Sequence, residues 1–169
     1  NVIQTSYNHQ TGTDRVFEVF ENVLKGEPDL IINLQGDMPN IQPEAINNLV
    51  NYMKKQECDI GTLASQINSL SEIENPNIVK VTVDGNLSKN IFLKAVDFFR
   101  INSNSKLNIY HHVGIYAFTN EGLKRYVKFK RSKLELNRNL EQLRALENNM
   151  SIHVGYIESC PLSVDTEQD

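Results

Sequence analysis

Residues 30–40, LIINLQGDMPN, decide how the rest of the chain is interpreted. Residues 30–34 are mostly apolar and have the length of a short buried strand. The strand runs directly into Gln35-Gly36-Asp37, so it delivers a carboxylate to its carboxyl end. Ligands of open α/β sheets bind at that edge. The first hypothesis is therefore a binding site at Asp37.

Composition limits the classes of function. The chain has 169 residues, 40% of them hydrophobic, which is enough for one domain with a core. Its net charge of −4 gives no general attraction to nucleic acid or to anionic lipid, so an anionic ligand needs a local site. Cys58 and Cys160 lie far apart without metal-type spacing, and we interpret them as reduced cysteines of a cytoplasmic protein. No run approaches the roughly 20 apolar residues of a membrane span.

Strand-like and helix-like patterns alternate along the chain. Apolar residues at helical spacing predict a helix with Thr13 or Asp14 as its cap and Gly26 as its stop, and a second that opens with Pro43. Further helices are predicted over 121–130 and, as one long helix, after the capping box Ser132-x-x-Glu135. The predicted strands are 30–34, 58–67, 78–83, 87–93, 113–118 and 152–157.

This alternation predicts an α/β fold with a mixed, mostly parallel sheet and helices on both faces. Asp84-Gly85-Asn86 lies between two apolar runs and predicts an inserted hairpin of strands 78–83 and 87–93. No repeat or linker divides the chain, so residues 1–169 are interpreted as one domain. The first residues resemble the tail of a strand and the last resemble a helix start, so we expect this domain to be truncated at both ends.

Two carboxylates are candidates for a magnesium site. Asp37 follows a strand beside a glycine that permits close backbone approach, and Asp165 follows the last strand at an apparent helix start. Each also has an ordinary explanation, because Asp37 suits a turn and Asp165 suits a helix N-cap. Magnesium on a nucleotide takes one or two protein carboxylates, so the two would suffice.

Other stretches carry polar groups that could bind a ligand. Residues 9–15, HQTGTDR, place hydroxyls and a glycine at a helix N-terminus, where free amides attract anions, although by themselves they favour a well-capped helix. His112 and Tyr116 share one strand face and could line a pocket. Glu141 and Gln142 interrupt a leucine stripe, and the basic run 124–133 is interpreted as a solvated helix edge.

Taken together, these stretches resemble the 3-deoxy-manno-octulosonate (Kdo) cytidylyltransferase family. The resemblance covers nearly the whole chain, in the order and approximate spacing of the family. It lies in the blocks His9-Gln10-x-Gly12-Thr13-Asp14-Arg15, Asn33-Leu34-Gln35-Gly36-Asp37-x-Pro39, Asn75-Pro76-Asn77-x-Val79-Lys80-Val81, His112-x-Gly114-Ile115-Tyr116, Leu140-Glu141-Gln142-Leu143-Arg144 and Val164-Asp165-Thr166.

The resemblance implies a Rossmann-like nucleotidyltransferase fold and a cytoplasmic, homodimeric enzyme of lipopolysaccharide biosynthesis. Such an enzyme transfers CMP from CTP to Kdo and releases pyrophosphate. Asp37 and Asp165 would be the catalytic Mg²⁺ ligands. The implied substrate-binding residues are Thr11, Gly12, Thr13, Arg15, Gln35, His112, Tyr116, Glu141 and Gln142.

Several departures from the family leave two other hypotheses open. Met38 stands in place of glutamate, Thr11 in place of serine, and Lys94 and His111 in place of arginine. Together with a short polar segment over 97–110, Lys94 favours a related enzyme that activates another sugar acid, such as a sialic-acid-type cytidylyltransferase. The family's N-terminal strand and basic triphosphate-gripping loop have no counterpart in this sequence, which also leaves open a non-catalytic fragment or remnant.

Overall fold

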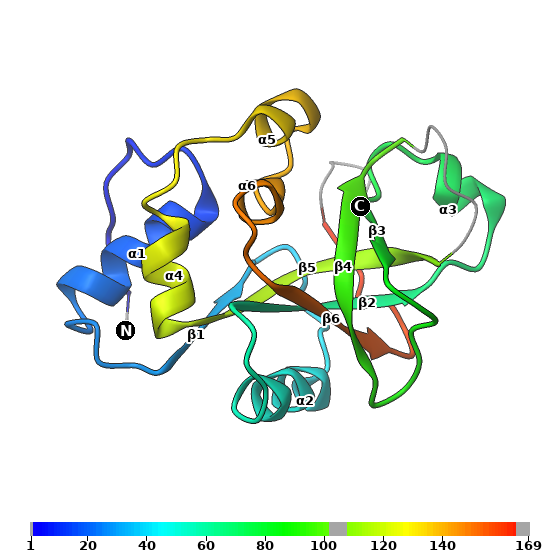
Figure 1. The fold of residues 1–169 in the computed structure, drawn as a ribbon, viewed down its shortest axis with the longest axis horizontal. Coiled ribbons are helices and arrows are strands. Elements are labelled where there is room, and N and C mark those ends of the chain that lie inside the picture. Colours follow the sequence, from blue (N-terminus) through cyan, green and yellow to red (C-terminus); the bar gives the residue numbers. More distant parts are fainter. Residues whose placement is uncertain (1, 102–107, 165–169) are drawn as a thin grey trace.

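The computed structural model describes residues 2–101 and 108–164, which form a sheet with helices on both sides (Figure 1). No helix among these residues is long and apolar enough to span a membrane. The helices are α1 (Gly12–Asn22), α2 (Pro43–Met53), α3 (Leu70–Glu74), α4 (Asn120–Tyr126), α5 (Lys133–Arg138) and α6 (Leu143–Glu147). The strands are β1 (Leu30–Leu34), β2 (Ile60–Gln66), β3 (Lys80–Val83), β4 (Phe92–Phe99), β5 (Ile109–Thr119) and β6 (Ile152–Ile157).

The sheet is mixed and partly closed. Its strand order is β1-β5-β2-β6-β4-β3, and a further pairing of β3 with β5 closes five of the strands into a ring. β5 is long enough to pair with β1 through residues 115–119 and with β3 through residues 109–111. The two partners lie along the same side of β5, while β2 occupies the other side.

The expected mostly parallel sheet is a wrong prediction. Among the described residues, only β2 and β6 pair in parallel, and the remaining pairings are antiparallel. β1 and β2 run in the same direction, as their connection through α2 implies, but β5 lies between them and runs against both. The local sequence pattern does not predict the insertion of β5 between β1 and β2. It specifies which side chains share a face of a strand, but not which strands pair with each other.

Each face of the sheet has its own core. One contains Phe20 of α1 and Tyr126 of α4, together with leucines that flank the turn between α5 and α6. The other contains Leu49 and Met53 of α2, packed on Ile115 of β5. Figure 1 shows the corresponding arrangement, with α2 on one side of the sheet and the other large helices opposite.

Two of the predicted helices begin or end elsewhere. The N-cap of α1 is Thr11, whose hydroxyl accepts a hydrogen bond from the amide of Asp14, so the helix starts before Thr13. α4 ends at Tyr126 and not at Lys130, because the chain leaves the helix about two turns after the Thr119 cap. The basic run 124–133 is therefore only partly helical.

The predicted long helix after Ser132 is two short helices. The capping box of Ser132 and Glu135 is present as expected. The helix then stops because Asn139 adopts a left-handed conformation with φ 52° and ψ 48°. Asparagine tolerates this region better than most residues, and the break turns residues 139–142 away from the helix axis.

The predicted hairpin exists with a longer loop. β3 pairs with β4 in antiparallel fashion, but Val83 faces Ala95, so the second strand begins at Phe92 and not at Leu87. Leu87 is buried in the loop, where its amide donates a hydrogen bond to the Tyr110 hydroxyl. β5 is also longer than the predicted strand 113–118 because both of its ends find partners.

Candidate functional site

A cleft of about 850 Å³ lies where the end of β1, the middle of β5 and the α5–α6 turn meet. It contains Gln35, Asp37, His112, Tyr116, Glu141 and Gln142, which are residues that the sequence predicted for the site. Its other walls come from the end of β2, from segments 68–79 and 158–163, and from Arg100 at the end of β4. The fold therefore brings together side chains that are more than one hundred residues apart in the sequence.

Asp37 lies at the end of β1, where the sequence predicted it. Its Oδ1 is buried and has no hydrogen-bond partner among the described residues. The Asp37 carbonyl accepts a hydrogen bond of 2.9 Å from the amide of Val164. Val164 directly precedes Asp165, which lies outside the described residues. At Gly36, a Cβ would meet no atom within 4 Å, so the backbone here is open to a ligand.

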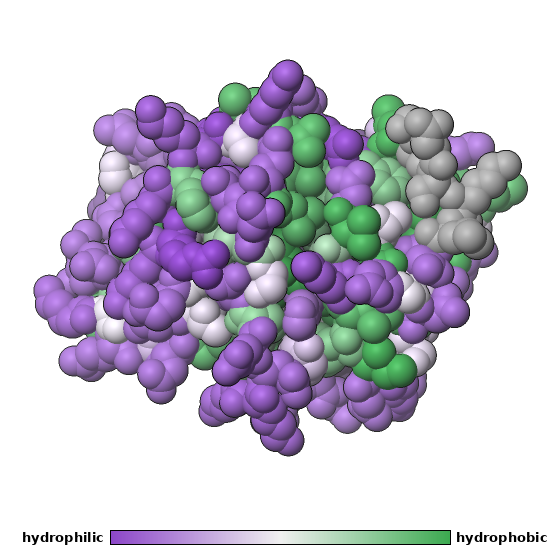
Figure 2. Space-filling model, in the orientation of Figure 1, coloured by the Kyte–Doolittle hydropathy of each residue, from purple (hydrophilic) through white to green (hydrophobic). Residues whose placement is uncertain are grey.

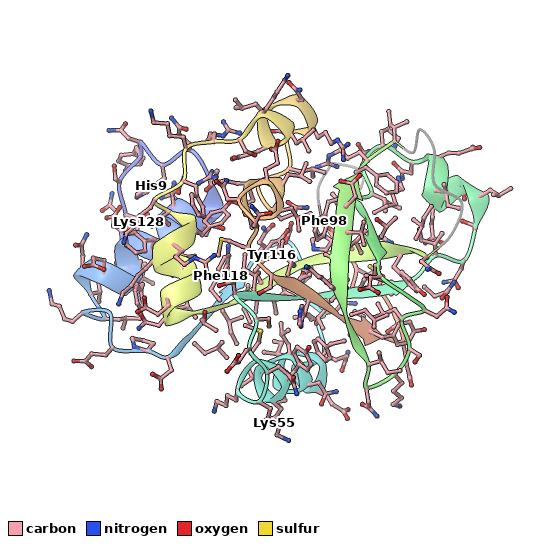
Figure 3. All side chains as sticks on the ribbon, viewed as in Figure 1. His9, Lys55, Phe98, Tyr116, Phe118 and Lys128 are labelled. Atoms are coloured by element: carbon pink, nitrogen blue, oxygen red, sulfur yellow. The ribbon has the colours of Figure 1, made fainter. Side chains whose placement is uncertain are left out.

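His112 and Tyr116 lie on one face of β5, as predicted, with their ring centroids 5.5 Å apart. They belong to a row of contacting rings that begins at Phe98 of β4 and ends at Tyr126 of α4. Figure 3 shows Phe98, Tyr116 and Phe118 of this row near the centre of the molecule. Burial lowers the pKa of His112 to about 3, so its imidazole is neutral.

Glu141 and Gln142 lie in the turn between α5 and α6, directly after Leu140. The Glu141 side chain accepts a hydrogen bond from the Thr13 hydroxyl, and its backbone carbonyl accepts one from the Tyr126 hydroxyl. Its second carboxylate oxygen is buried and has no partner among the described residues. Burial raises the pKa of Glu141 above its ordinary value.

A buried ion network holds this turn in place. Arg144 donates two hydrogen bonds to Glu135, at 2.7 and 2.9 Å, and both side chains are almost fully buried. The Arg144 guanidinium also lies over the Tyr126 ring, 4.6 Å from its centroid. Asp14 of α1 contacts the same guanidinium at 3.5 Å. The network thus joins α1, α4, α5 and α6 behind the cleft.

The N-terminus of α1 contributes only in part to the cleft. Thr13 is buried and reaches the cleft through Glu141, and Thr11 caps the helix. Gly12 lies close to the side chain of Asn33, and a Cβ at this glycine would approach that amide to 3.9 Å. Arg15 is exposed and hydrogen-bonds Thr5 and Ser6, so the structure does not bring it to the cleft.

The sequence interpretation missed Arg100. This side chain lines the cleft and donates hydrogen bonds to the carbonyls of Pro76 and Asn77, at 3.2 and 2.8 Å. It is the only lysine or arginine among the described lining residues. The one available signal was its position directly after the apolar pair that ends a strand.

Three departures from the family have a clear location. Lys94 is exposed on β4 and does not line the cleft, so it gives no support to a different sugar acid. Met38 is buried against the core beneath α2, where a glutamate would have placed a charge. His111 does line the cleft and lies 3.7 Å from Glu72, and burial lowers its pKa.

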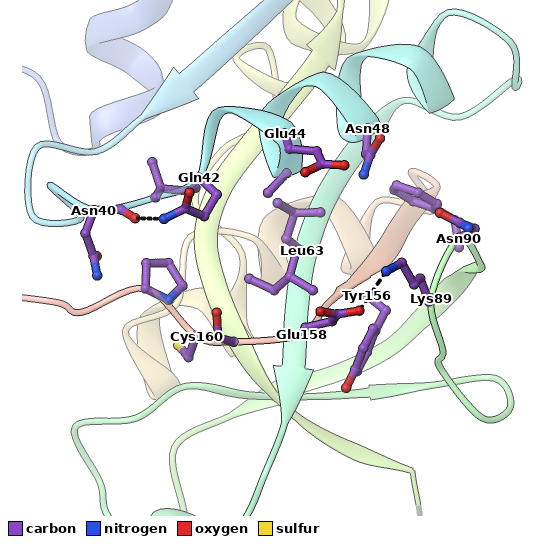
Figure 4. A pocket seen from close by; sticks show the side chains of 16 residues that line it. Asn40, Gln42, Glu44, Asn48, Leu63, Lys89, Asn90, Tyr156, Glu158 and Cys160 are labelled. Carbon is purple, nitrogen blue, oxygen red and sulfur yellow. Dashed lines mark hydrogen bonds and ion pairs between the residues drawn. The ribbon is translucent and has the colours of Figure 1, made fainter.

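A second, smaller pocket of about 240 Å³ lies between α2, the loop before β4 and the end of β6 (Figure 4). Its floor includes Leu63 and Phe92, and the exposed ion pair of Lys89 and Glu158 lies at its rim. The two pockets share the wall 158–161. Among the described residues, none of those predicted for the site lines this pocket.

Comparison with known proteins identifies the family. A family model described as cytidylyltransferase matches residues 1–152. The 3-deoxy-manno-octulosonate cytidylyltransferase of Bartonella tribocorum is 41% identical over 172 residues, which is 99% of this chain and 69% of that protein. The chain belongs to the 3-deoxy-manno-octulosonate cytidylyltransferase family. The resemblance predicted from the sequence blocks is thereby confirmed.

Further members of this cytidylyltransferase family match in the same way. The Rhizobium etli protein of that name is 38% identical, over 100% of this chain and 67% of its own length. A solved structure of CMP:2-keto-3-deoxy-manno-octonic acid synthetase complexed with CTP has a TM-score of 0.85 and 32% identity, over 98% of this chain and 67% of that one. The chain thus spans about two thirds of the length of these relatives.

The nucleotidyltransferase fold extends to more distant proteins. An apo UDP-glucose pyrophosphorylase has a TM-score of 0.61 at 12% identity, over 94% of this chain and 56% of that one. At that identity the likeness concerns the fold alone. The mixed sheet with an inserted antiparallel strand is therefore shared by enzymes that differ in sequence.

Proposed function

We propose that this protein transfers CMP from CTP to Kdo, with release of pyrophosphate. The observation that carries the proposal is the convergence of Asp37, His112, Tyr116, Glu141 and Gln142 in one cleft. Family membership supports both substrates, since one relative was solved with CTP and the others are named for the Kdo reaction. The product, an activated Kdo, is the form required for lipopolysaccharide biosynthesis.

Magnesium is the cofactor that we propose for the end of β1. The unpartnered, buried Oδ1 of Asp37 fits a hard cation, which prefers oxygen ligands. The cleft also contains Glu72, Glu141 and Glu158, with Arg100 as the single lysine or arginine among the described lining residues. An anionic triphosphate therefore needs a bound cation here. We propose that Asp165 is the second ligand, because the preceding Val164 is hydrogen-bonded to Asp37.

The opposite end of the cleft suits a hydroxylated sugar acid. We propose that Arg100 pairs with the carboxylate, because a guanidinium offers several donors in a fixed plane. His112, Tyr116, Glu141 and Gln142 would orient the sugar ring and its hydroxyls. Gln35 lines the same cleft, with its side chain beside Gly114 of β5, and we propose that it contacts both substrates.

The N-terminus of α1 would hold the nucleotide or the sugar acid from the side. We propose this role for Thr11, Gly12 and Thr13, whose backbone lies behind Glu141. Thr13 supports it by its hydrogen bond to Glu141. Arg15 would reach a substrate only after releasing Thr5 and Ser6, so we retain it as the weakest member of the set.

The proposed reaction is attack of the C2 hydroxyl of Kdo on the α-phosphorus of CTP. The new bond joins that oxygen to phosphorus, the bond to the bridging oxygen breaks, and pyrophosphate leaves. Bound Mg²⁺ would neutralise charge on the phosphates. The chain's own residues hold the two substrates in line, exclude water through the aromatic row, and fix the sugar hydroxyls by hydrogen bonds.

A homodimer is proposed as the working assembly. Figure 2 shows apolar side chains gathered in the middle of one face, along β4 and beside α6. Val96 of β4 is 60% exposed and Leu136 of α5 is 56% exposed. Apolar surface of this kind marks interfaces more often than it marks free surface. Sedimentation analysis of the protein would give its mass in solution, and a purely monomeric mass would overturn the assignment.

Pyrophosphate release tests the proposed function. The purified chain is incubated with CTP, Mg²⁺ and Kdo, and in parallel with neuraminate as a competing sugar acid. We expect release with Kdo and little with neuraminate. The reverse preference would favour the sialic-acid-type enzyme, and silence with both would overturn catalysis by this chain.

A further inference from the structure

A bulge interrupts the pairing of β2 with β5 beside His112. Thr62 faces Tyr116 in the register, but the next residue, Leu63, faces Val113. Gly114 and Ile115 therefore have no partner in β2, and β5 bends away from it. Bulges of this kind redirect side chains next to functional sites.

The side chain of Thr62 fills the bulge. Its Oγ1 lies 2.7 Å from the carbonyl oxygen of Ile115 and 3.2 Å from that of Val113. The same Oγ1 lies 3.0 Å from Nε2 of His112. Thr62 is fully buried and His112 is 7% exposed, so these groups depend on each other for hydrogen bonds.

The number of protons available decides which group donates. A threonine hydroxyl has a single proton and two lone pairs. The carbonyl of Ile115 has only lone pairs, so at 2.7 Å the Thr62 proton must point toward it. Were the proton directed at His112 instead, two carbonyl oxygens would face lone pairs of Oγ1 at close distance. The contact with His112 therefore requires that Nε2 carries a proton and donates it to Oγ1.

We propose that Thr62 is a positioning residue that holds neutral His112 as its Nε2–H tautomer and thereby presents the Nδ1 lone pair to a ligand hydroxyl. A neutral imidazole with Nε2 protonated has its lone pair on Nδ1. Phe98 and Tyr116 pack against the ring, with centroids 5.1 and 5.5 Å away, and limit its rotation. The ring lines the cleft, and in this tautomer its acceptor is the nitrogen that Thr62 does not contact.

The chemical consequence is selectivity for a donor. A lone pair on a neutral ring accepts a hydrogen bond from a hydroxyl and disfavours a carboxylate or phosphate oxygen at the same position. The identity of the ligand, a hydroxyl of the sugar acid, rests on the proposed function. The proton on Nε2 rests on the geometry of the bulge, and the lone pair on Nδ1 follows because the buried ring is also neutral.

Nitrogen NMR of the imidazole rings tests the tautomer without any substrate. The protein contains four histidines, and a His112→Asn variant identifies the signals of His112 by difference. At pH 7 we expect Nδ1 to show the shift of an unprotonated ring nitrogen and Nε2 that of a protonated one. A protonated Nδ1, or averaging of the two nitrogens in the wild-type protein, would overturn the proposal.

Substitution of Thr62 tests its part in this arrangement. Thr62→Val removes the hydroxyl at nearly constant shape, and we expect the His112 nitrogens to move toward averaged shifts. Thr62→Ser retains the hydroxyl and should retain the wild-type pattern. Thr82→Val makes the same change at a buried threonine of β3, outside the cleft, and controls for general effects of the substitution. A wild-type tautomer in folded Thr62→Val would show that the hydroxyl does not set it.

Kinetics supply a second readout that is separable from the first. We expect Thr62→Val to raise KM for the sugar acid about tenfold while KM for CTP stays unchanged, which is the pattern of a lost substrate contact. Thr62→Ser should restore the wild-type KM. Equal changes for both substrates would contradict the assignment of His112 to the sugar. A protein inactive with every sugar acid would contradict the proposed function and leave the NMR result to decide the tautomer.

Discussion

At the scale of single residues, Asp37 combines features that a structural acid does not need. An ordinary turn acid satisfies its oxygens with nearby amides, whereas Oδ1 of Asp37 is buried without a partner among the described residues. Such an atom costs stability unless a ligand compensates for it. The sequence predicted the position of this carboxylate because Gly36 and Asp37 directly follow a clear strand pattern, which places the side chain at the end of that strand.

Substitution of Asp37 separates the two explanations. We expect Asp37→Asn to lower magnesium-dependent pyrophosphate release by about 100-fold or more, since the carboxylate would hold the cation that neutralises charge on the phosphates. Spin resonance of Mn²⁺ should show weakened metal binding in the absence of substrate. Asp84→Asn, in the exposed loop after β3, is the matched control and should change neither. Unchanged Mn²⁺ affinity in Asp37→Asn would refute the metal assignment.

Glu141 is a second residue at which the requirements of stability and of ligand binding conflict. Burial raises its pKa, so the folded state favours the protonated carboxyl. The contribution of Glu141 to the free energy of unfolding is therefore complete below its unfolded-state pKa near 4.5. It is lost as pH rises through the folded-state pKa. Ionisation of this buried carboxyl therefore costs stability, which is expected where a side chain serves a ligand.

For Glu141→Gln, we accordingly expect opposite effects on stability and on binding. The free energy of unfolding at pH 7, measured with urea, should increase because an amide cannot ionise, whereas ionisation of the buried carboxyl costs stability. KM for the sugar acid should rise about tenfold, as for the loss of one hydrogen bond to a charged group. Glu158→Gln, which alters an exposed ion pair at the cleft rim, should leave both nearly unchanged. A less stable Glu141→Gln protein would contradict the argument.

At the scale of elements, periodicity predicted what depends on neighbours along the chain. The predicted bounds of β1 and β6 and the predicted start of α2 at Pro43 agree with the structure. Each of these elements has a clear apolar pattern and a strong start or stop signal. The break at Asn139 was not predicted, since the leucine stripe continues in phase across it. The bounds of β4 and the place of β5 depend on partners far away in the sequence, which no local pattern specifies.

The left-handed turn at Asn139 can be tested against an internal control. Asn139 and Asn149 both have positive φ, 52° and 56°, and both are exposed, but only Asn139 lines the cleft. We expect Asn139→Ala and Asn149→Ala each to cost about 1 kcal/mol of stability, as alanine is strained in this conformation. Only Asn139→Ala should also raise KM for the sugar acid, by about fivefold, because it disturbs Glu141 and Gln142. Similar kinetics for the two variants would refute a positioning role for the turn.

At the scale of the whole molecule, the cleft depends on a buried ion network that the sequence did not reveal. Burial acts to raise the pKa of Glu135, but hydrogen bonds from Arg144, Arg131 and Ser132 outweigh it and hold the pKa below the ordinary value. The network contacts α1 and α4, and Tyr126 of α4 donates a hydrogen bond to the backbone of Glu141 in the turn between α5 and α6. From the sequence alone, the capping role of Glu135 could be predicted. Its ion pair with Arg144 could not, because Arg144 lies nine residues away across a helix break.

The energetics of this network give the last prediction. We expect Arg144→Met to cost about 3–5 kcal/mol, because it leaves a buried carboxylate without its partner. The double variant Glu135→Leu, Arg144→Met should cost clearly less than Arg144→Met alone, since an apolar pair requires no buried counter-charge.

The lowered pKa of Glu135 also makes the stability depend on pH. The contribution of Glu135 to the free energy of unfolding is present above about pH 4.5 and is lost as pH falls through the folded-state pKa. Urea unfolding at pH 7 and pH 4 should therefore show a smaller loss on acidification for the double variant than for the wild type. Additive costs, or identical pH dependence, would mean that the network contributes no coupled stability and that the cleft is held by packing alone.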